Sequence, residues 1–361
     1  MQRIRIGLVG AGLIGGAHSA VLRTIADAMP GQIELTAVAE PSAERRELFV
    51  ALYGYRQAVA DVHALLDRAD VDAVFVCTPT GAHAEVVNAA AAAGKHLFCE
   101  KPLAMSHAQA VEMLAAVRRA GVRAQIGLVL RFSAVYTVMR DLLQTTDAGN
   151  PVAVLFRDDQ VFPIRGVHHT AWRRDRTLTA GGTLIEHGVH DLDLLTWFFG
   201  PIARLRAWQQ NRAGHAGVED YVAAEIEFAS GLRAHLVTLW HDMLQRPSNR
   251  RLEIFCQRGF FASDHDMVGD MVVQIGDGAE GRLGTREVLD RFAALLGRAD
   301  DRFRDWYAVP YLLQDLEFVE ALLADRDPQP GLEIGVEAQR LAEGVYRAAE
   351  QGTEVEVGAA R

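Results

Sequence analysis

Short apolar runs alternate with longer amphipathic runs over roughly the first 130 residues of the chain. The run Val74-Phe75-Val76 is continuously apolar, which is typical of a parallel strand covered on both faces. Strands that alternate with helices along a chain indicate a doubly wound parallel sheet. The expected strands are Ile4–Gly10, Ile33–Glu40, Val71–Thr78, His96–Glu100 and Arg123–Leu130, and the expected helices are Leu13–Ala28, Ala43–Leu52, Ala82–Ala93 and Ser106–Ala120.

The pattern changes after Asn150-Pro151, where longer runs with partial alternation begin. Ser230-Gly231 between two such runs indicates a hairpin turn, and a helix over Thr183–Phe199 is expected to end at Gly200-Pro201. The other expected strands are Val152–Gln160, Ala203–Gln210, Tyr221–Ala229, Leu232–Trp240, Arg251–Cys256, Met271–Ile275 and Glu354–Val357, and the other helices are Tyr311–Ala324 and Glu333–Gln351. We therefore expect an α+β second domain whose antiparallel or mixed sheet has one open face, which a partner subunit could cover.

The composition narrows the class of protein. A chain of 361 residues exceeds a comfortable single core, so two domains are expected. The net charge of −10 without a long basic run argues against nucleic acid or an anionic membrane as partner. No apolar stretch reaches the roughly 20 residues that span a bilayer. The strand pattern begins too close to the N-terminus to leave room for a signal peptide.

Three cysteines, Cys77, Cys99 and Cys256, have neither the parity of a disulfide framework nor zinc-ligand spacing. Cys77 and Cys99 end apolar strands, where a buried thiol behaves as a small hydrophobic group. We interpret all three as structural thiols and expect a cytoplasmic protein.

The segment Gly10-Ala11-Gly12-Leu13-Ile14-Gly15 lies between the first expected strand and the first expected helix. This context makes the pattern typical of a dinucleotide-binding loop, with the phosphates bound by N–H groups at the helix N-terminus. Glu40 ends the second strand, where a carboxylate hydrogen-bonds ribose hydroxyls and favours NAD over NADP. Arg45 and Arg46 keep NADP open as the less favoured cofactor. Thr78-Pro79-Thr80 is expected to border the nicotinamide.

Only two of the 37 basic residues are lysines, and they are six positions apart. A lysine amine can be tuned to titrate near neutrality, whereas an arginine stays charged. Proton transfer can therefore use Lys101, which stands between Glu100 and Pro102 at the end of an apolar strand. Lys95 is adjacent to a helix end and has no expected chemical role.

A second group of polar residues lies on the helix expected over Thr183–Phe199. Glu186 and His190 are four residues apart, and Asp193 follows three residues later, so all three can share one helix face. The imidazole of His190 suits acid–base chemistry near neutrality, and Asp193 is available to orient it. Glu186, His187 and His190 are also metal-ligand types. His187 is offset from the helix face that Glu186 and His190 share, and no third ligand at characteristic spacing is visible, so we expect no metal.

Other candidates for substrate contact carry weaker signals. Trp172 could stack on a sugar ring, and Arg173 beside it could bind hydroxyls or a carboxylate. Arg131, Arg157 and Asp158 are further candidates, although solvated charge at strand ends explains them equally well. The preceding pair His168-His169 is expected to be loop surface.

Taken together, these motifs resemble the glucose–fructose oxidoreductase / inositol dehydrogenase (Gfo/Idh/MocA) family. The resemblance rests on the glycine fingerprint, Cys77-Thr78-Pro79-Thr80 with His83, Glu100-Lys101-Pro102, and the segment from Gly181 to Asp193. It implies a Rossmann domain (residues 1–125) and a second domain for substrate binding and oligomerisation (126–361) with a large, mostly antiparallel, open-faced sheet. Homodimers or homotetramers would form through that sheet.

The resemblance also implies roles for single residues. Lys101 matches the lysine that meets the substrate hydroxyl and the nicotinamide, and His190 matches the acid–base histidine. Glu186 stands where several members have Asp, which keeps the carboxylate but moves it by one methylene. His83, Glu100 and Lys101 would border the cofactor.

The implied activity is NAD(P)-dependent oxidation or reduction of a secondary alcohol of a sugar, cyclitol or sugar derivative. Two alternatives stay open: an NAD-dependent glycoside-cleaving enzyme that oxidises its substrate transiently, and an NAD-binding regulatory protein without turnover.

Overall fold

The computed structural model describes residues 3–165, 170–297, 306 and 308–358. The chain forms two compact units. The first contains Met1–Leu128 and Tyr311–Gln339, and the second contains Val129–Pro310 and Arg340–Arg361. The chain therefore returns to the first unit after it has built most of the second.

The first unit contains a six-stranded sheet in the order β3-β2-β1-β4-β5-β6, and every pair of neighbours is parallel. This is the strand order of dinucleotide-binding folds, and it confirms the predicted doubly wound sheet. The strands are β1 Ile4–Val9, β2 Ile33–Ala39, β3 Gln57–Val59, β4 Ala73–Val76, β5 His96–Cys99 and β6 Ala124–Ile126.

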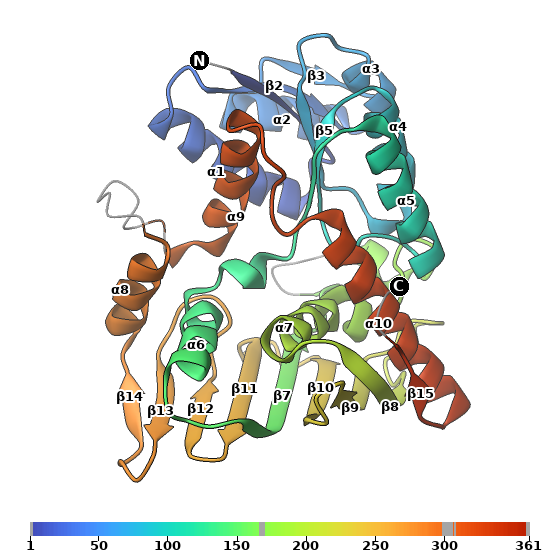
Figure 1. The fold of residues 1–361 in the computed structure, drawn as a ribbon. Helices are drawn as coiled ribbons and strands as arrows, with labels where there is room; N and C mark the ends of the chain where they lie inside the picture. Colours follow the sequence, from blue (N-terminus) through green and yellow to red (C-terminus); the bar gives the residue numbers. More distant parts are fainter. Residues whose placement is uncertain (1–2, 166–169, 298–305, 307, 359–361) are drawn as a thin grey trace. The chain divides into compact units, whose positions relative to one another are not determined.

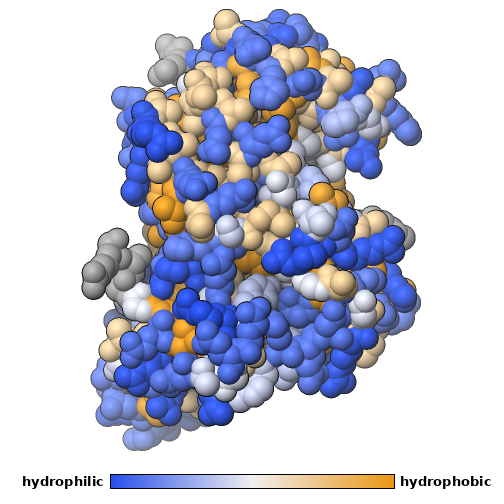
Figure 2. All heavy atoms as spheres, turned by 90° about the vertical axis from the view of Figure 1, so that its right-hand side faces the viewer, coloured by the Kyte–Doolittle hydropathy of each residue, from blue (hydrophilic) through white to orange (hydrophobic). Residues whose placement is uncertain are grey.

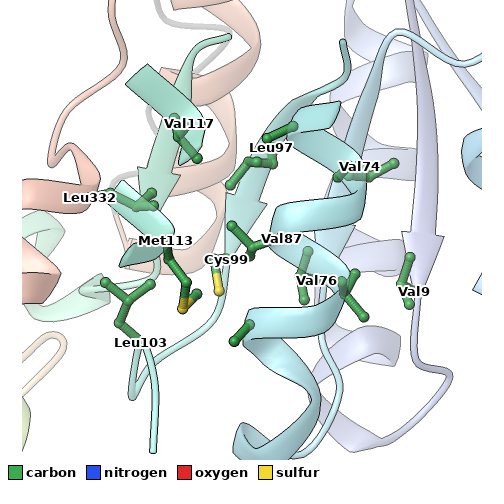
Figure 3. Packing of buried hydrophobic residues seen from close by; sticks show 14 of the residues in the cluster. Val9, Val74, Val76, Val87, Leu97, Cys99, Leu103, Met113, Val117 and Leu332 are labelled. Atoms are coloured by element: carbon green, nitrogen blue, oxygen red, sulfur yellow. The ribbon is translucent and has the colours of Figure 1, made fainter. Parts of the chain in front are cut away.

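Helices cover both faces of this sheet (Figure 1). They are α1 Leu13–Ala28, α2 Ala43–Tyr53, α3 Val62–Leu66, α4 His83–Ala92, α5 His107–Ala120 and α9 Pro310–Leu323. Figure 3 shows one layer of the core, where Val87, Met113 and Val117 from α4 and α5 lie against β4 and β5. Leu332, which begins α10 (Leu332–Gln351), completes this layer. Burial of each such side chain contributes about 1.5–3 kcal/mol.

The second unit contains a nine-stranded sheet in the order β14-β13-β12-β11-β7-β10-β9-β8-β15. Among the described strands of this sheet, only the pair β7 and β10 is parallel, which confirms a large, mostly antiparallel sheet. The strands are β7 Pro151–Val161, β8 Ile202–Gln210, β9 Tyr221–Phe228, β10 Arg233–His241, β11 Asn249–Cys256, β12 Gly259–Ser263, β13 Met271–Ile275, β14 Gly281–Leu283 and β15 Val355–Glu356.

Among the described residues, helices cover one face of this sheet and leave the other open. Along β7, Val154 and Phe156 are buried, whereas Leu155 between them is 40% exposed. Phe156 contacts Tyr136 of the covering helix α6. The helices of this unit are α6 Ala134–Thr145, α7 Val189–Phe199, α8 Thr285–Leu295 and the last part of α10 (Figure 1).

Polar and charged side chains predominate on the face that Figure 2 shows, with apolar side chains in patches between them. None of the helices in the described part of the chain is long and apolar enough to cross a membrane.

Candidate active site

The loop between β1 and α1 has the geometry of a phosphate-binding turn. Gly10 has φ +98°, and a Cβ there would lie 2.7 Å from the carbonyl oxygen of Cys77. A Cβ on Gly15 would lie 2.2 Å from the Gly10 carbonyl oxygen, so only glycine permits this close packing of helix on strand. At Gly12, by contrast, no described atom lies within 4 Å of the Cβ position. The space beside Gly12, at the N-terminus of α1, is therefore open to a pyrophosphate.

Glu40 follows β2 and reaches back to this loop. Its Oε2 accepts a hydrogen bond from the Ala11 amide at 3.0 Å, and its Oε1 accepts one from the Ser42 amide at 3.1 Å. A guanidinium nitrogen of Arg46 donates to the Glu40 carbonyl oxygen at 2.6 Å, and Arg45 lies 3.9 Å from the carboxylate. The acid and the two arginines therefore share the corner of the sheet where an adenosine ribose would bind.

The loops after β4 and β5 are tied together by His83. This imidazole is buried, and its Nε2 lies 2.9 Å from the Thr78 carbonyl oxygen while its Nδ1 lies 2.9 Å from that of Pro102. Burial lowers the pKa of His83. His83 therefore acts on the cofactor site through the two loops. The hydroxyl of Thr78 is buried and has no hydrogen-bond partner among the described residues, which leaves it for a ligand.

Lys101 lies in the loop that follows β5. Its amide donates to Oε2 of Glu100 at 3.1 Å, its side chain is half-buried, and its peptide bond to Pro102 is cis. Strands β1, β4 and β5 are neighbours in one parallel sheet. The glycine loop, Thr78 and Lys101 therefore follow the carboxyl ends of adjacent strands, the edge at which such sheets bind ligands.

The other lysine has a structural role. Nζ of Lys95 donates to the carbonyl oxygens of Arg68 at 2.8 Å and Val71 at 2.9 Å, in the segment that leads into β4. These two bonds explain why Lys95 is present, as a residue that fixes a loop.

His18 is a polar residue of this unit that the sequence analysis missed. It is fully buried in α1, and its Nδ1 lies 2.8 Å from Oδ2 of Asp315 in α9. Its Nε2 lies 3.0 Å from Oε1 of Glu100. Burial alone would lower the pKa of His18, but the two carboxylates raise it to about 10. His18 and Lys101 in turn hold the pKa of Glu100 below its ordinary value despite burial. The available signal was a histidine on the apolar face of the first helix.

This ion cluster makes the stability of the protein depend on pH. Protonation of His18 stabilises the fold fully below pH 6.5 and ceases to do so as the pH rises through about 10, because the pKa is higher in the folded state. The midpoint of urea unfolding is expected to fall more steeply over that range in the wild type than in His18→Gln. Parallel pH dependences of the two proteins would contradict this assignment.

In the second unit, the predicted helix over Thr183–Phe199 begins differently from what was expected. Its first turn, Leu184–Gly188 (η4), is π-helical, and the α-helical part starts at Val189. The prediction of regular i,i+4 spacing between Glu186 and His190 is therefore corrected, because a π turn rotates its residues relative to an α-helix. Such π turns occur frequently at functional sites.

Glu186 is brought together with the predicted substrate residues Trp172 and Arg173. Its Oε2 accepts from Nε of Arg173 at 2.8 Å, and its Oε1 accepts from the hydroxyl of Thr179 at 2.8 Å. The guanidinium of Arg173 lies over the Trp172 ring at 4.8 Å. The carboxylate is buried, and His190 is 6% exposed. Glu186 therefore fixes the guanidinium of Arg173.

The other candidates are placed differently. Asp193 binds Arg131 with both carboxylate oxygens, at 2.7 Å and 2.9 Å, so the prediction that it orients the imidazole of His190 is replaced by this ion pair. Arg157 is 44% exposed and pairs with Asp159. Its neighbours in β7, Phe156 and Asp158, are buried under the helices, so Arg157 points to the open face and away from His190.

A buried carboxylate holds the start of the η4–α7 segment. Glu219 accepts hydrogen bonds from the amides of Gly182 at 2.7 Å and Leu184 at 3.0 Å, and from the hydroxyl of Tyr346 at 2.9 Å. A Cβ on Gly182 would lie 1.7 Å from the Glu219 carbonyl oxygen, so this position requires glycine. The Gly181-Gly182-Thr183 motif thus permits the close approach that satisfies the first amides of the turn.

Removal of this cap should destabilise the protein. Glu219→Ala leaves three donors without their acceptor, and we expect the free energy of unfolding in urea to fall by about 3 kcal/mol. Tyr346→Phe removes one of these bonds and should cost about 1 kcal/mol. Equal losses in the two variants would show that the amides of the turn do not depend on Glu219.

A second ion cluster binds α7 to the sheet through Arg250 of β11 and Asp191 of α7. Arg250 is buried and donates to Asp191 at 2.9 Å, to Asp158 at 3.1 Å and to Asp266 at 2.8 Å. Burial and the neighbouring Asp158 raise the pKa of Asp191 well above its ordinary value. Asp158 therefore belongs to this internal cluster.

His187, a residue of a metal-ligand type, lies in the η4 turn. Nδ1 of His187 accepts from the indole of Trp240 at 3.2 Å. Among the residues that the structure describes, no group of three His, Cys, Asp or Glu side chains could hold a metal ion. His168-His169 lies outside the described residues.

Comparisons with known proteins agree with this architecture. Residues 4–128 match an oxidoreductase family with an NAD-binding Rossmann fold, and residues 136–262 match the GFO/IDH/MocA C-terminal domain. The chain is 35% identical to a 1,5-anhydro-D-fructose reductase of Ensifer adhaerens over 66% of this chain and 68% of the relative. It is 26% identical to an inositol 2-dehydrogenase of Rhizobium meliloti over 98% and 99% of the two chains. A crystal structure of an oxidoreductase domain protein from Kribbella flavida superposes with a TM-score of 0.86 at 26% identity, over 99% of this chain and 100% of the other.

Proposed function

Since the chain belongs to the GFO/IDH/MocA family of NAD-binding oxidoreductases, we propose that it oxidises or reduces a secondary alcohol of a sugar, a cyclitol or a sugar derivative. Residues 1–125 would bind the cofactor and residues 126–361 the substrate. The observation that carries the proposal is that Lys101, Thr78 and the glycine loop follow the carboxyl ends of three successive strands, β5, β4 and β1, at the ligand-binding edge of the parallel sheet. Relatives named for 1,5-anhydro-D-fructose and inositol support a polyhydroxylated ring as substrate.

The cofactor fits the residues present. The open space at Gly12 suits the phosphates, and the carboxylate of Glu40 suits a ribose. The buried hydroxyl of Thr78 suits the nicotinamide side. When bound, NAD supplies the hydride acceptor. The chain itself has to hold the alcohol and remove the proton from its hydroxyl.

Two side chains carry the proton chemistry in this proposal. The imidazole of His190 takes the hydroxyl proton in oxidation and returns it in reduction, because an imidazole titrates near neutrality. The ammonium of Lys101 stabilises the developing alkoxide and lowers the pKa of the substrate hydroxyl. Glu186 positions the substrate through Arg173, whose fork of N–H donors suits hydroxyl and carboxylate oxygens. Trp172 offers a ring for stacking on the sugar.

Absorbance at the NADH band across a panel of sugars, cyclitols and uronic acids tests this function, with NAD and NADP in parallel. We expect NADH in stoichiometric amount with at least one polyhydroxylated compound. Glycoside cleavage without accumulation of NADH would replace the proposal with transient oxidation, and NAD binding without any turnover would replace it with a regulatory role.

The choice of NAD over NADP is assigned to Glu40. Its carboxylate would repel a 2′-phosphate, so Glu40→Gln should weaken NAD binding by about tenfold and tighten NADP binding. Glu47→Gln, which neutralises an exposed carboxylate in α2, is the matched control and should leave the Kd of NAD unchanged. Titration calorimetry with both cofactors measures these changes. An unaltered preference in Glu40→Gln would place selectivity elsewhere.

The open face of the second sheet supports assembly into a homodimer or homotetramer. Leu155, Trp208 and Phe255 lie on this face with 40%, 47% and 42% of their surface exposed. Exposed apolar groups on an uncovered sheet are favourable places for a partner subunit.

A further inference from the structure

The buried cluster of His18, Glu100 and Asp315 joins three parts of the first unit. His18 comes from α1, the helix that begins at the glycine loop; Glu100 precedes Lys101; and Asp315 comes from α9, 297 residues after His18. The His18 ring also packs against Phe75 and Phe98, with centroids 5.4 Å and 5.0 Å away. These aromatic walls exclude water from the cluster.

The hydrogen-bond geometry suits a protonated His18. Both ring nitrogens face carboxylate oxygens, at 2.8 Å and 3.0 Å, and an ionised carboxylate only accepts hydrogen bonds. An imidazolium donates to both carboxylates, and its charge opposes the burial that raises the pKa of Asp315. The raised pKa of His18 agrees with this geometry.

Glu100 transmits this arrangement to Lys101. One of its oxygens accepts from His18 and the other from the Lys101 amide. A Cβ on Gly127 would lie 2.7 Å from Oε1 of Glu100, so the carboxylate is also confined from the side of β6. Glu100 also lies near the buried thiols of Cys77 and Cys99, whose pKa values are raised by burial and by its negative charge, so both thiols stay neutral. Glu100 is thus held as a fixed negative charge beside Lys101.

We propose that His18 is a positioning residue for Lys101: as an imidazolium anchored by Asp315, it keeps Glu100 ionised and oriented, and Glu100 fixes the loop and the charge environment of Lys101. An effect of this cluster on catalysis rests on the proposed function of Lys101. The effect of the cluster on the pKa of Lys101 does not depend on any substrate.

The scarcity of lysine makes the test direct. Growth with [ε-13C]lysine gives a protein with two labelled side chains, Lys95 and Lys101, and the Lys95→Arg variant assigns their NMR signals. The pKa of Lys101 is then read in the full-length protein without substrate. Lys95, which is bound to two carbonyl oxygens of a different loop, is the internal control for a native fold.

We expect the pKa of Lys101 to fall by about one unit in Glu100→Gln, because a neighbouring negative charge is lost. A fall in the same direction is expected in His18→Gln, where Glu100 takes up a proton. The double variant should show no larger shift than Glu100→Gln alone, since His18 acts through Glu100. The Lys95 signal should be unchanged throughout.

An unchanged Lys101 pKa in Glu100→Gln with a native Lys95 signal would overturn the proposal, and so would additive shifts in the double variant. Loss of the native Lys95 signal in His18→Gln would mean that this variant does not fold. The pKa of Lys101 in Glu100→Gln then decides whether Glu100 controls Lys101. A protein inactive on every polyol but with the expected shifts would contradict the proposed function and leave the positioning cluster supported.

Discussion

Lys101→Met is expected to lower kcat by about 10²–10⁴-fold while changing the Kd of NAD less than about threefold. Methionine keeps much of the length and apolar stem of the side chain but removes the ammonium that would stabilise an alkoxide. The backbone anchor survives, because Glu100 accepts from the Lys101 amide, which the substitution retains. Stopped-flow kinetics with the best substrate, together with NAD titration, measures both quantities.

Two further variants test the ammonium at this position. Lys101→Arg keeps the positive charge but carries it on a larger, planar group, so it should recover only part of the lost rate. Lys95→Arg removes the other lysine, which binds two backbone carbonyl oxygens, and should retain wild-type turnover. Near-normal turnover in Lys101→Met would exclude Lys101 from the chemistry.

His190→Asn is expected to reduce kcat by about 10²–10³-fold, since asparagine preserves a polar side chain but cannot accept the hydroxyl proton. The variant should also lose the limb of the kcat–pH profile in the neutral range, where an imidazole titrates. Asp193→Asn is the matched control on the same helix, because Asp193 is bound to Arg131 and should affect stability more than the pH profile. A profile in His190→Asn with the wild-type shape would assign the titrating group elsewhere.

The periodic elements of this fold could be predicted from the sequence. The helix Leu13–Ala28 and the strand Met271–Ile275 have the bounds that the pattern predicted, because a glycine turn and polar segments mark their ends. The pattern missed β3 (Gln57–Val59), a short edge strand with little burial, and the covering helices α6 and α8. It also had no means to show that Leu184–Gly188 forms a π turn, which depends on the Glu219 cap from a distant loop.

The site was predictable where chemistry follows a local motif and not where it depends on distant contacts. Gly10, Glu40 and Lys101 each stand at the end of a predicted strand, so their common edge followed from the fold class. The bond between His18 and Asp315 joins residues 297 positions apart, and no local pattern signals it. The ion pair of Asp193 with Arg131 likewise required the folded chain.

The most direct test of the proposed proton transfer is NADH formation per molecule of alcohol consumed, in the wild type and in the double variant Lys101→Met/His190→Asn. We predict one NADH for each alcohol oxidised by the wild type. We predict no measurable NADH from the double variant, even though it still binds NAD. Turnover by the double variant at a rate near that of the wild type would contradict the roles assigned to Lys101 and His190.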